Sequence, residues 1–227
     1  MDGIRNALEA QRKLEQEFVA EALRSETAPK GWPAALVMFH LAMWRERLRN
    51  ALADLAEDRP FAPPPENIDE LNDAELVGGI GTPLADAAGR ADLLLGEMID
   101  LYGRLGERPM AWFTARTTTE AVLRNSYMHP RVHLSGYLKE NGFAERSAKL
   151  WDDALADMKG AGAPPFIMGG VLYNRAWTQA SRGEVDEALR TLGHALEMRP
   201  DLKSGAAGDP DMAPLRDHPR FQELIKS

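Results

Sequence analysis

The stretch GWPAALVMFHLAMWRERL, residues 31–48, decides the fold because its apolar side chains recur at helical spacing. The buried face that this spacing predicts runs through Leu36, His40, Trp44, Leu48, Leu52 and Leu55. Pro33 suits the first turn of a helix, where a missing N–H costs nothing. The sequence therefore predicts one long helix that ends near Glu57.

The same spacing of three and four extends over most of the chain, whereas alternation with period two is rare. It predicts further long helices at 4–24, 83–106 and 119–141 and a weaker one from about residue 68. Thr82–Pro83 and the threonines at 117–119 provide helix starts. The stretch DRPFAPPPEN, residues 58–67, is a loop, and ERPMAWF, residues 107–113, is expected to be a linker. The fold class is therefore all-α, and residues 1–141 are predicted to form a four-helix bundle with long crossover connections.

Residues 142–227 follow a different pattern. The segment at 172–200 matches a tetratricopeptide repeat at Ala176, Gly183, Ala188, Leu192, Ala195 and Pro200. A weaker copy precedes it, with Gly142 at its turn and Trp151 behind it. The tail, from Asp209 onward, is expected to form a capping helix over the last repeat. The chain is thus divided into a bundle and a short run of repeat-like helical hairpins.

The composition excludes several classes of function. The formal charge is −8, from 27 Lys and Arg against 35 Asp and Glu, which disfavours binding to nucleic acid. No apolar run approaches the roughly 18 residues of a membrane helix. The chain has no cysteine, which excludes disulfides, thiolate zinc sites and a cysteine nucleophile. The charged opening residues are unlike a signal peptide, so a cytoplasmic location is expected.

Three of the five histidines are candidate metal ligands. In NSYMHPRVHLSGYL, residues 125–138, His129 and His133 lie one helical turn apart and share a face. His40 lies on an apolar helix face and is expected to point inward or toward a mouth of the bundle, whereas His194 and His218 are expected at the surface. Three imidazoles would leave one or more coordination positions open, as in catalytic sites. The alternative is that His40 is a packed histidine bonded to a carbonyl and that His129 and His133 are helix-surface residues whose spacing arises by chance. Pro130 slightly favours this alternative because it disturbs the helix.

Other polar residues near the histidines offer weaker signals. Asn125, Ser126 and Tyr137 fall on or near the histidine face, and Arg124 and Tyr127 lie a helical step aside. Each by itself is more simply a solvent-facing helix residue. Glu46 and Asp54 on the earlier helix are weak alternatives for a general base, and surface charge is their default role.

The segments GWPAALVMFHLAMWRERL and NSYMHPRVHLSGYL resemble the two signature segments of the DinB-like superfamily of four-helix bundles, which includes YfiT-like and DfsB-like proteins. The resemblance covers about residues 1–140. It implies a metal triad of His40, His129 and His133 that holds Zn or Ni. Characterised members include thiol-cofactor-dependent transferases and isomerases and small-molecule hydrolases. The resemblance thus implies a divalent metal, a small-molecule substrate and, for some reactions, a low-molecular-weight thiol.

A second hypothesis from the sequence is a protein-interaction module. The repeats would form a concave groove for a partner, and Asn174, Arg175 and Arg182 would favour an acidic peptide end. The repeats could equally support a homodimer. The two hypotheses are compatible, since a partner bound by the repeats could be brought to the bundle.

Overall fold

The computed structural model describes residues 2–226, which divide into two compact units, residues 2–142 and 143–226. The division falls one residue after the predicted boundary. Nearly all regular structure in both units is helical, which confirms the all-α fold class. No helix within the described part of the chain has both the length and the apolar character needed to cross a membrane.

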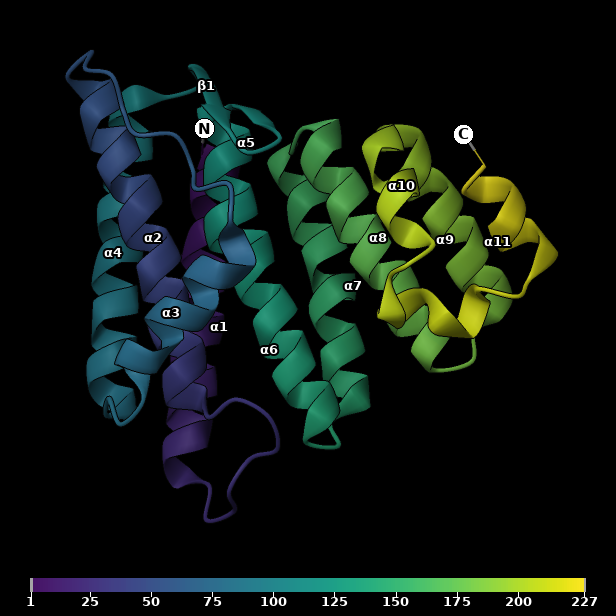
Figure 1. Cartoon of the computed structure of the whole chain (residues 1–227). Coiled ribbons are helices and arrows are strands. Elements are labelled where there is room, and N and C mark those ends of the chain that lie inside the picture. The colour runs from purple at the N-terminus through teal and green to yellow at the C-terminus, as the bar shows by residue number, and fades with distance from the viewer. Residues whose placement is uncertain (1, 227) are drawn as a thin grey trace. The chain divides into compact units, whose positions relative to one another are not determined.

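The first unit is built from four long helical segments that lie side by side (Figure 1). Its elements are α1 (Asp2–Arg24), α2 (Ala34–Ala56), α3 (Ile68–Gly79), α4 (Leu84–Leu105), β1 (Pro109–Trp112), β2 (Ala115–Thr117), α5 (Thr118–Leu123), η1 (Arg124–Met128) and α6 (His129–Glu140). α2 packs along α4, and α1 packs on α4 and η1. The fourth segment is the continuous run α5–η1–α6, and the short α3 packs against α2.

The central helix α2 is buried over most of its surface, as its apolar sequence predicts. Leu41, Leu48 and Leu52 are 0–1% exposed. Pro33 and Pro83 occupy the N-cap positions of α2 and α4, whereas the sequence pattern predicts them in the first turn of each helix. The side chain of Thr117 caps α5 by accepting a hydrogen bond from the amide of Glu120 at 3.2 Å. The predicted start of the fourth segment is therefore confirmed.

The prediction of a linker at 107–113 was wrong, because these residues enter a small β-hairpin. β1 and β2 pair antiparallel, with Pro109 opposite Thr117 and Trp112 opposite Ala115. The turn holds Phe113 at a φ of 52°, an unusual value for a bulky residue. The hairpin buries Met110 and Trp112 against the bundle. This burial gives an irregular-looking sequence its fixed conformation.

A π-helical turn, η1, lies directly before Pro130 in the fourth segment. The amide of His129 bonds to the carbonyl of Arg124, five residues earlier. A proline at position 130 would crowd the carbonyl four residues before it in a regular α-helix. The wider turn relieves this crowding, so the fourth segment continues past the proline without a break.

A buried ion pair joins α1 to α2 within the core. The guanidinium of Arg45 donates to both carboxylate oxygens of Glu15, at 2.8 and 2.6 Å, and to the carbonyl of Ala91 at 3.1 Å. Arg45 is 0% and Glu15 3% exposed. Gln11 also donates to Glu15. The two charges therefore form a buried, hydrogen-bonded pair between α1 and α2.

The second unit consists of consecutive packed helices with a short tail. Its elements are α7 (Ala144–Ala161), α8 (Pro165–Ser181), α9 (Val185–Met198), η2 (Pro200–Leu202), α10 (Lys203–Ala206), η3 (Pro210–Leu215) and α11 (Pro219–Leu224). α8 packs on α7 and α9, and the turn between α8 and α9 contains Gly183 at a φ of 79°. α11 packs on α9 and buries Phe221. The tail is held to α8 by a hydrogen bond from Tyr173 to Asp209 at 2.7 Å.

Candidate metal centre

The three histidines singled out by the sequence converge on one point in the first unit. The Nε2 atom of His129 lies 3.1 Å from Nε2 of His40 and 2.9 Å from Nε2 of His133. The ligand atoms of all three rings lie within 4.8 Å of one another. His40 is buried, and the other two are partly buried. The arrangement is close enough to hold a single metal ion.

Two helices bring these rings together. α2 supplies His40 from its buried face, and α6 supplies His129 and His133 from successive turns. The contact between α2 and the η1–α6 segment sets the distance between the two helices. The hydrogen bond from Nδ2 of Asn125 to the carbonyl of Trp44, at 3.0 Å, ties the helices together within one turn of the site.

Burial keeps all three imidazoles in their neutral form. It lowers the pKa of His40 to about 3 and that of His133 to about 4. The pKa of His129 is also held well below its ordinary value, again mainly by burial. Nearby cations add to this effect, with Arg47 acting on His40 and Arg124 acting on His129. Neutral imidazoles with available lone pairs are the form that binds metal.

Three neutral rings that face one another cannot satisfy one another fully by hydrogen bonds. Nε2 of His129 has one N–H to donate at most, yet two Nε2 atoms lie within 3.1 Å of it. A cation at the common point would accept lone pairs from all three. Nδ1 of His40 is buried and has no hydrogen-bond partner among residues 2–226. A metal-bound histidine usually donates a hydrogen bond from its other ring nitrogen to a carboxylate, a carbonyl or a water, and among residues 2–226 no such acceptor bonds to Nδ1 of His40.

Two tryptophans flank the histidine cluster. The ring of Trp32 stacks on His133 with centroids 5.5 Å apart and an interplanar angle of 11°. Its edge faces His40 at 5.3 Å. On the other side, Trp44 approaches His40 and His129 edge-on, at 6.4 Å in each case. These rings surround the cluster with apolar surface and so account for much of its burial.

A cavity of about 260 Å³ opens beside His129. Its walls are mainly apolar and come from Trp44, Ile68, Phe113, Met128 and Val132. The polar lining consists of Asn72, Arg124 and Asn125. The guanidinium of Arg124 lies over the Phe113 ring, 4.7 Å from its centroid. The cavity therefore suits a small, largely apolar molecule with a few polar contacts.

The polar residues predicted near the histidines take different roles. Asn125 and Ser126 are buried and bonded to each other, with the Ser126 hydroxyl donating to Oδ1 of Asn125 at 2.9 Å. They therefore hold the helices in place, and the solvent-facing default for both is wrong. Tyr127 is fully buried beneath the guanidinium of Arg131, 4.3 Å from its ring centroid. Tyr137 is partly buried near His133, where it lines a second cavity.

The two carboxylates considered as general bases are engaged elsewhere. Glu46 pairs with Arg90 at 2.7 Å, and Asp54 pairs with Arg59 at 2.7 Å. Both pairs lie at the surface, in agreement with the default role of these residues. Neither carboxylate lines the cavities beside the histidines.

The other two histidines do not join the cluster. His194 is exposed on α9, as expected. His218 caps α11, where its Nδ1 accepts a hydrogen bond from the amide of Arg220 at 3.2 Å. Both belong to the second unit, so they provide matched controls for experiments on the first.

The three residues proposed to line a peptide groove are bonded within the second unit. Arg175 pairs with Asp152 at 2.7 Å, and Arg182 pairs with Glu184 at 2.9 Å. The amide group of Asn174 donates to a carbonyl one turn earlier on α8. An acidic peptide would have to compete with these carboxylates for the two arginines.

Sequence reasoning missed several residues that surround the histidines. Trp32 stacks on His133, Glu140 lines the cavity that also reaches His133, and Phe113 lies in the cavity beside His129. The sequence pattern placed Trp32 at the start of a helix and Phe113 in a linker, so it indicated no role at the site for either residue. Glu140 follows His133 by seven residues, a helical spacing that could have placed it on the same face.

Comparisons of the chain with protein-family models, with curated proteins and with solved structures find no match. The case for a function therefore depends on the geometry of the histidines and the cavities beside them.

Proposed function

We propose that the first unit is a metal-dependent enzyme of the DinB-like kind that acts on a small molecule. A divalent ion would be held by His40, His129 and His133. The observation that carries the proposal is the convergence of three neutral Nε2 atoms from two helices. Hydrolysis or a thiol-dependent transfer are the reactions that fit such a centre.

The distances between ligand atoms support a first-row divalent ion. With metal–nitrogen bonds of about 2.0–2.1 Å, a right angle at the ion separates two nitrogens by about 2.9 Å, and a tetrahedral angle by about 3.3 Å. The distances of 2.9 and 3.1 Å fall between these values. Zn and Ni both accept imidazole ligands at such angles. Three protein ligands leave positions for a substrate and a second reactant.

The ion would supply a Lewis acid and lower the pKa of a bound water or thiol. The chain itself provides the surroundings. Trp32 and Trp44 exclude water from two sides of the histidines. The cavity beside His129 would hold the apolar part of the substrate, and Asn72 and Arg124 would orient its polar part.

Metal analysis of the full chain tests the proposal. The protein is stripped with a chelator, reloaded separately with Zn²⁺, Ni²⁺ and Co²⁺, and its metal content is measured after dialysis. We expect one ion per chain. Each of His40→Ala, His129→Ala and His133→Ala should weaken binding by on the order of 100-fold. His194→Ala, an exposed histidine in the second unit, is the control and should bind like the wild type. A wild-type chain that retains none of the three metals would overturn the proposal.

A further inference from the structure

A second cavity, of about 390 Å³, reaches the histidine cluster at a different ring. It is lined by His133, Trp32, Tyr137, Glu140 and the exposed Val132, among others. The first cavity reaches the cluster at His129, and Val132 lines both. The Nε2 atoms of His129 and His133 are 2.9 Å apart. Two separate ligands could therefore meet at one centre.

The second cavity differs from the first in charge. It contains the carboxylate of the exposed Glu140 and the phenol of the partly buried Tyr137. Burial raises the pKa of Tyr137, so its hydroxyl stays protonated and neutral. The indole of Trp32 adds an aromatic face. A carboxylate beside two aromatic rings is a combination that recognises an organic cation.

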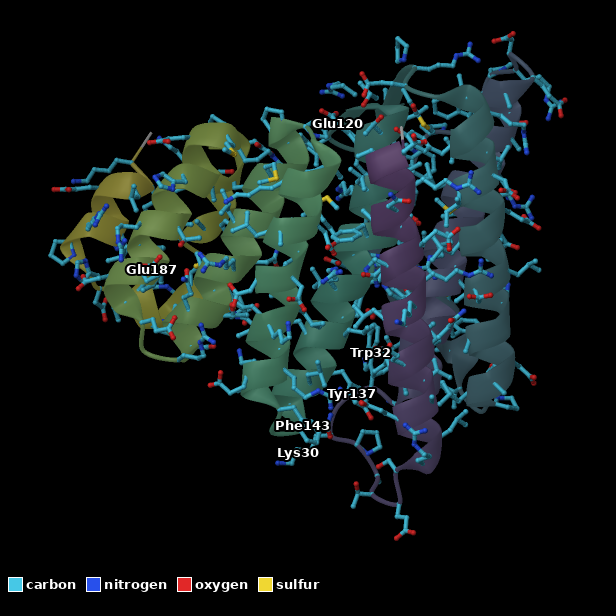
Figure 2. The ribbon with its side chains drawn as sticks, turned by 180° about the vertical axis from the view of Figure 1, so that it is seen from behind. Lys30, Trp32, Glu120, Tyr137, Phe143 and Glu187 are labelled. Carbon is cyan, nitrogen blue, oxygen red and sulfur yellow. The ribbon has the colours of Figure 1, made fainter. Side chains whose placement is uncertain are left out.

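The mouth of this cavity is held in a fixed shape by the loop at 25–33. Asn141 at the end of α6 accepts a hydrogen bond from the amide of Lys30 at 2.8 Å and donates to its carbonyl at 3.3 Å. Gly31 has a φ of 70°, and the carboxylate of Glu140 occupies the place where a Cβ of residue 31 would lie. The labelled side chains Lys30, Trp32 and Tyr137 lie near the same end of the first unit (Figure 2). The loop thus positions both Trp32 and Glu140.

The charged end and the metal end of the cavity are well separated. His133, Tyr137 and Glu140 follow one another along α6 at intervals of four and three residues. Seven residues of helix span about 10 Å along the axis. An ammonium at Glu140 would therefore be far enough from a divalent ion at His133 to escape most of its repulsion.

We propose that this cavity binds a small molecule with a primary ammonium at one end and a metal-seeking donor at the other. Glu140 holds the ammonium against the faces of Trp32 and Tyr137, and the donor reaches the ion beside His133. The molecule is the second reactant of a two-substrate reaction whose first, apolar substrate occupies the cavity beside His129. The ammonium subsite is formed by Glu140, Trp32 and Tyr137 and does not require a metal ion. Only the binding of the donor to the ion rests on the proposed function.

The ammonium subsite is tested on the metal-free full chain by ligand-observed NMR, with butylammonium as the probe and butanol as its neutral counterpart. We expect butylammonium to bind more tightly than butanol in the wild type. Glu140→Gln should remove this preference and weaken butylammonium binding at least about fivefold. Glu107→Gln, an exposed carboxylate of the same unit that lines neither cavity, is the matched control. Equal binding of the two probes, or an unchanged affinity in Glu140→Gln, would refute the subsite.

The donor end is tested on the Co²⁺-loaded chain with aminohexanethiol and hexanethiol. Thiolate binding to cobalt is followed by its charge-transfer absorption. The amino compound should bind more tightly in the wild type, and Glu140→Gln should abolish that advantage while the absorption band remains. If the chain takes up no metal, the proposed function fails and the NMR result still decides the subsite. If both thiols bind cobalt equally, the metal centre stands and the two-ended ligand does not.

Discussion

The buried pair of Arg45 and Glu15 gives the sharpest prediction about the stability of the site. Replacing Arg45 with Leu leaves the Glu15 carboxylate in a position that is 3% exposed, without the two hydrogen bonds of 2.6 and 2.8 Å that now satisfy it. Breaking a buried pair from one side costs about 3–5 kcal/mol because an uncompensated charge remains. Arg45→Leu should therefore destabilise the first unit by that amount. The double variant Arg45→Leu with Glu15→Met removes both charges and should recover most of the loss.

The assay is urea unfolding of the metal-free protein, followed by circular dichroism and by tryptophan fluorescence. Three of the five tryptophans, at positions 32, 44 and 112, lie in the first unit, so more than half of the tryptophan fluorescence reports on that unit. Arg49→Leu is the matched control, because Arg49 lies on the same helix as Arg45 and also forms an ion pair, with Glu97 of α4. The side chains of Arg49 and Glu97 are 33% and 41% exposed. It should cost no more than about 1 kcal/mol. A loss below about 1 kcal/mol in Arg45→Leu, or a double variant less stable than the single one, would refute this reasoning.

The remaining predictions concern the histidine cluster and the loop above it. Because burial lowers the folded-state pKa of His40 to about 3 and of His133 to about 4, protons bind the unfolded chain preferentially below pH about 6.5. The metal-free protein should be most stable above that pH and lose up to about 1.4 kcal/mol per pH unit per histidine as the pH falls toward 4. Urea unfolding at several pH values measures this, and a variant with both histidines replaced by Gln should show a flatter profile. Gly31→Val should displace the Glu140 carboxylate and abolish the butylammonium preference seen by NMR, with metal content unchanged. Gly81→Val carries similar backbone strain at a φ of 85° with no atom in its way, and it should keep that preference.

The helices and the three histidines could be predicted because both depend on spacing along the chain. The apolar period fixes which face of α2 is buried, and His40 lies on that face. The interval of four between His129 and His133 fixes their common direction on α6. What spacing alone left open was whether the two helices would bring these faces together. The signature segments of the resemblance supplied that expectation, and the structure bears out the convergence.

The parts that escaped prediction depend on contacts between distant residues. The hairpin at β1 and β2 forms because Met110 and Trp112 find a buried place on the bundle, which no local propensity reveals. Trp32 belongs to a loop whose position is set by the bonds between Lys30 and Asn141, more than a hundred residues apart. The π-helical turn was also out of reach, although Pro130 marked the place where the helix had to change.

The π-helical turn at Arg124–Met128 also sets the direction in which His129 and His133 point from the fourth segment. Each residue of an α-helix advances the direction of the side chains by about 100°. A π-helical turn takes up one more residue than an α-helical turn, so rewinding Arg124–Met128 as ordinary α-helix with all five residues kept would swing everything beyond it by roughly that angle relative to α5. The imidazoles of His129 and His133 would then face away from His40 on α2, although all three rings were still present. A change of helix type over one turn, with no histidine replaced, would thus be enough to separate the three metal-binding rings.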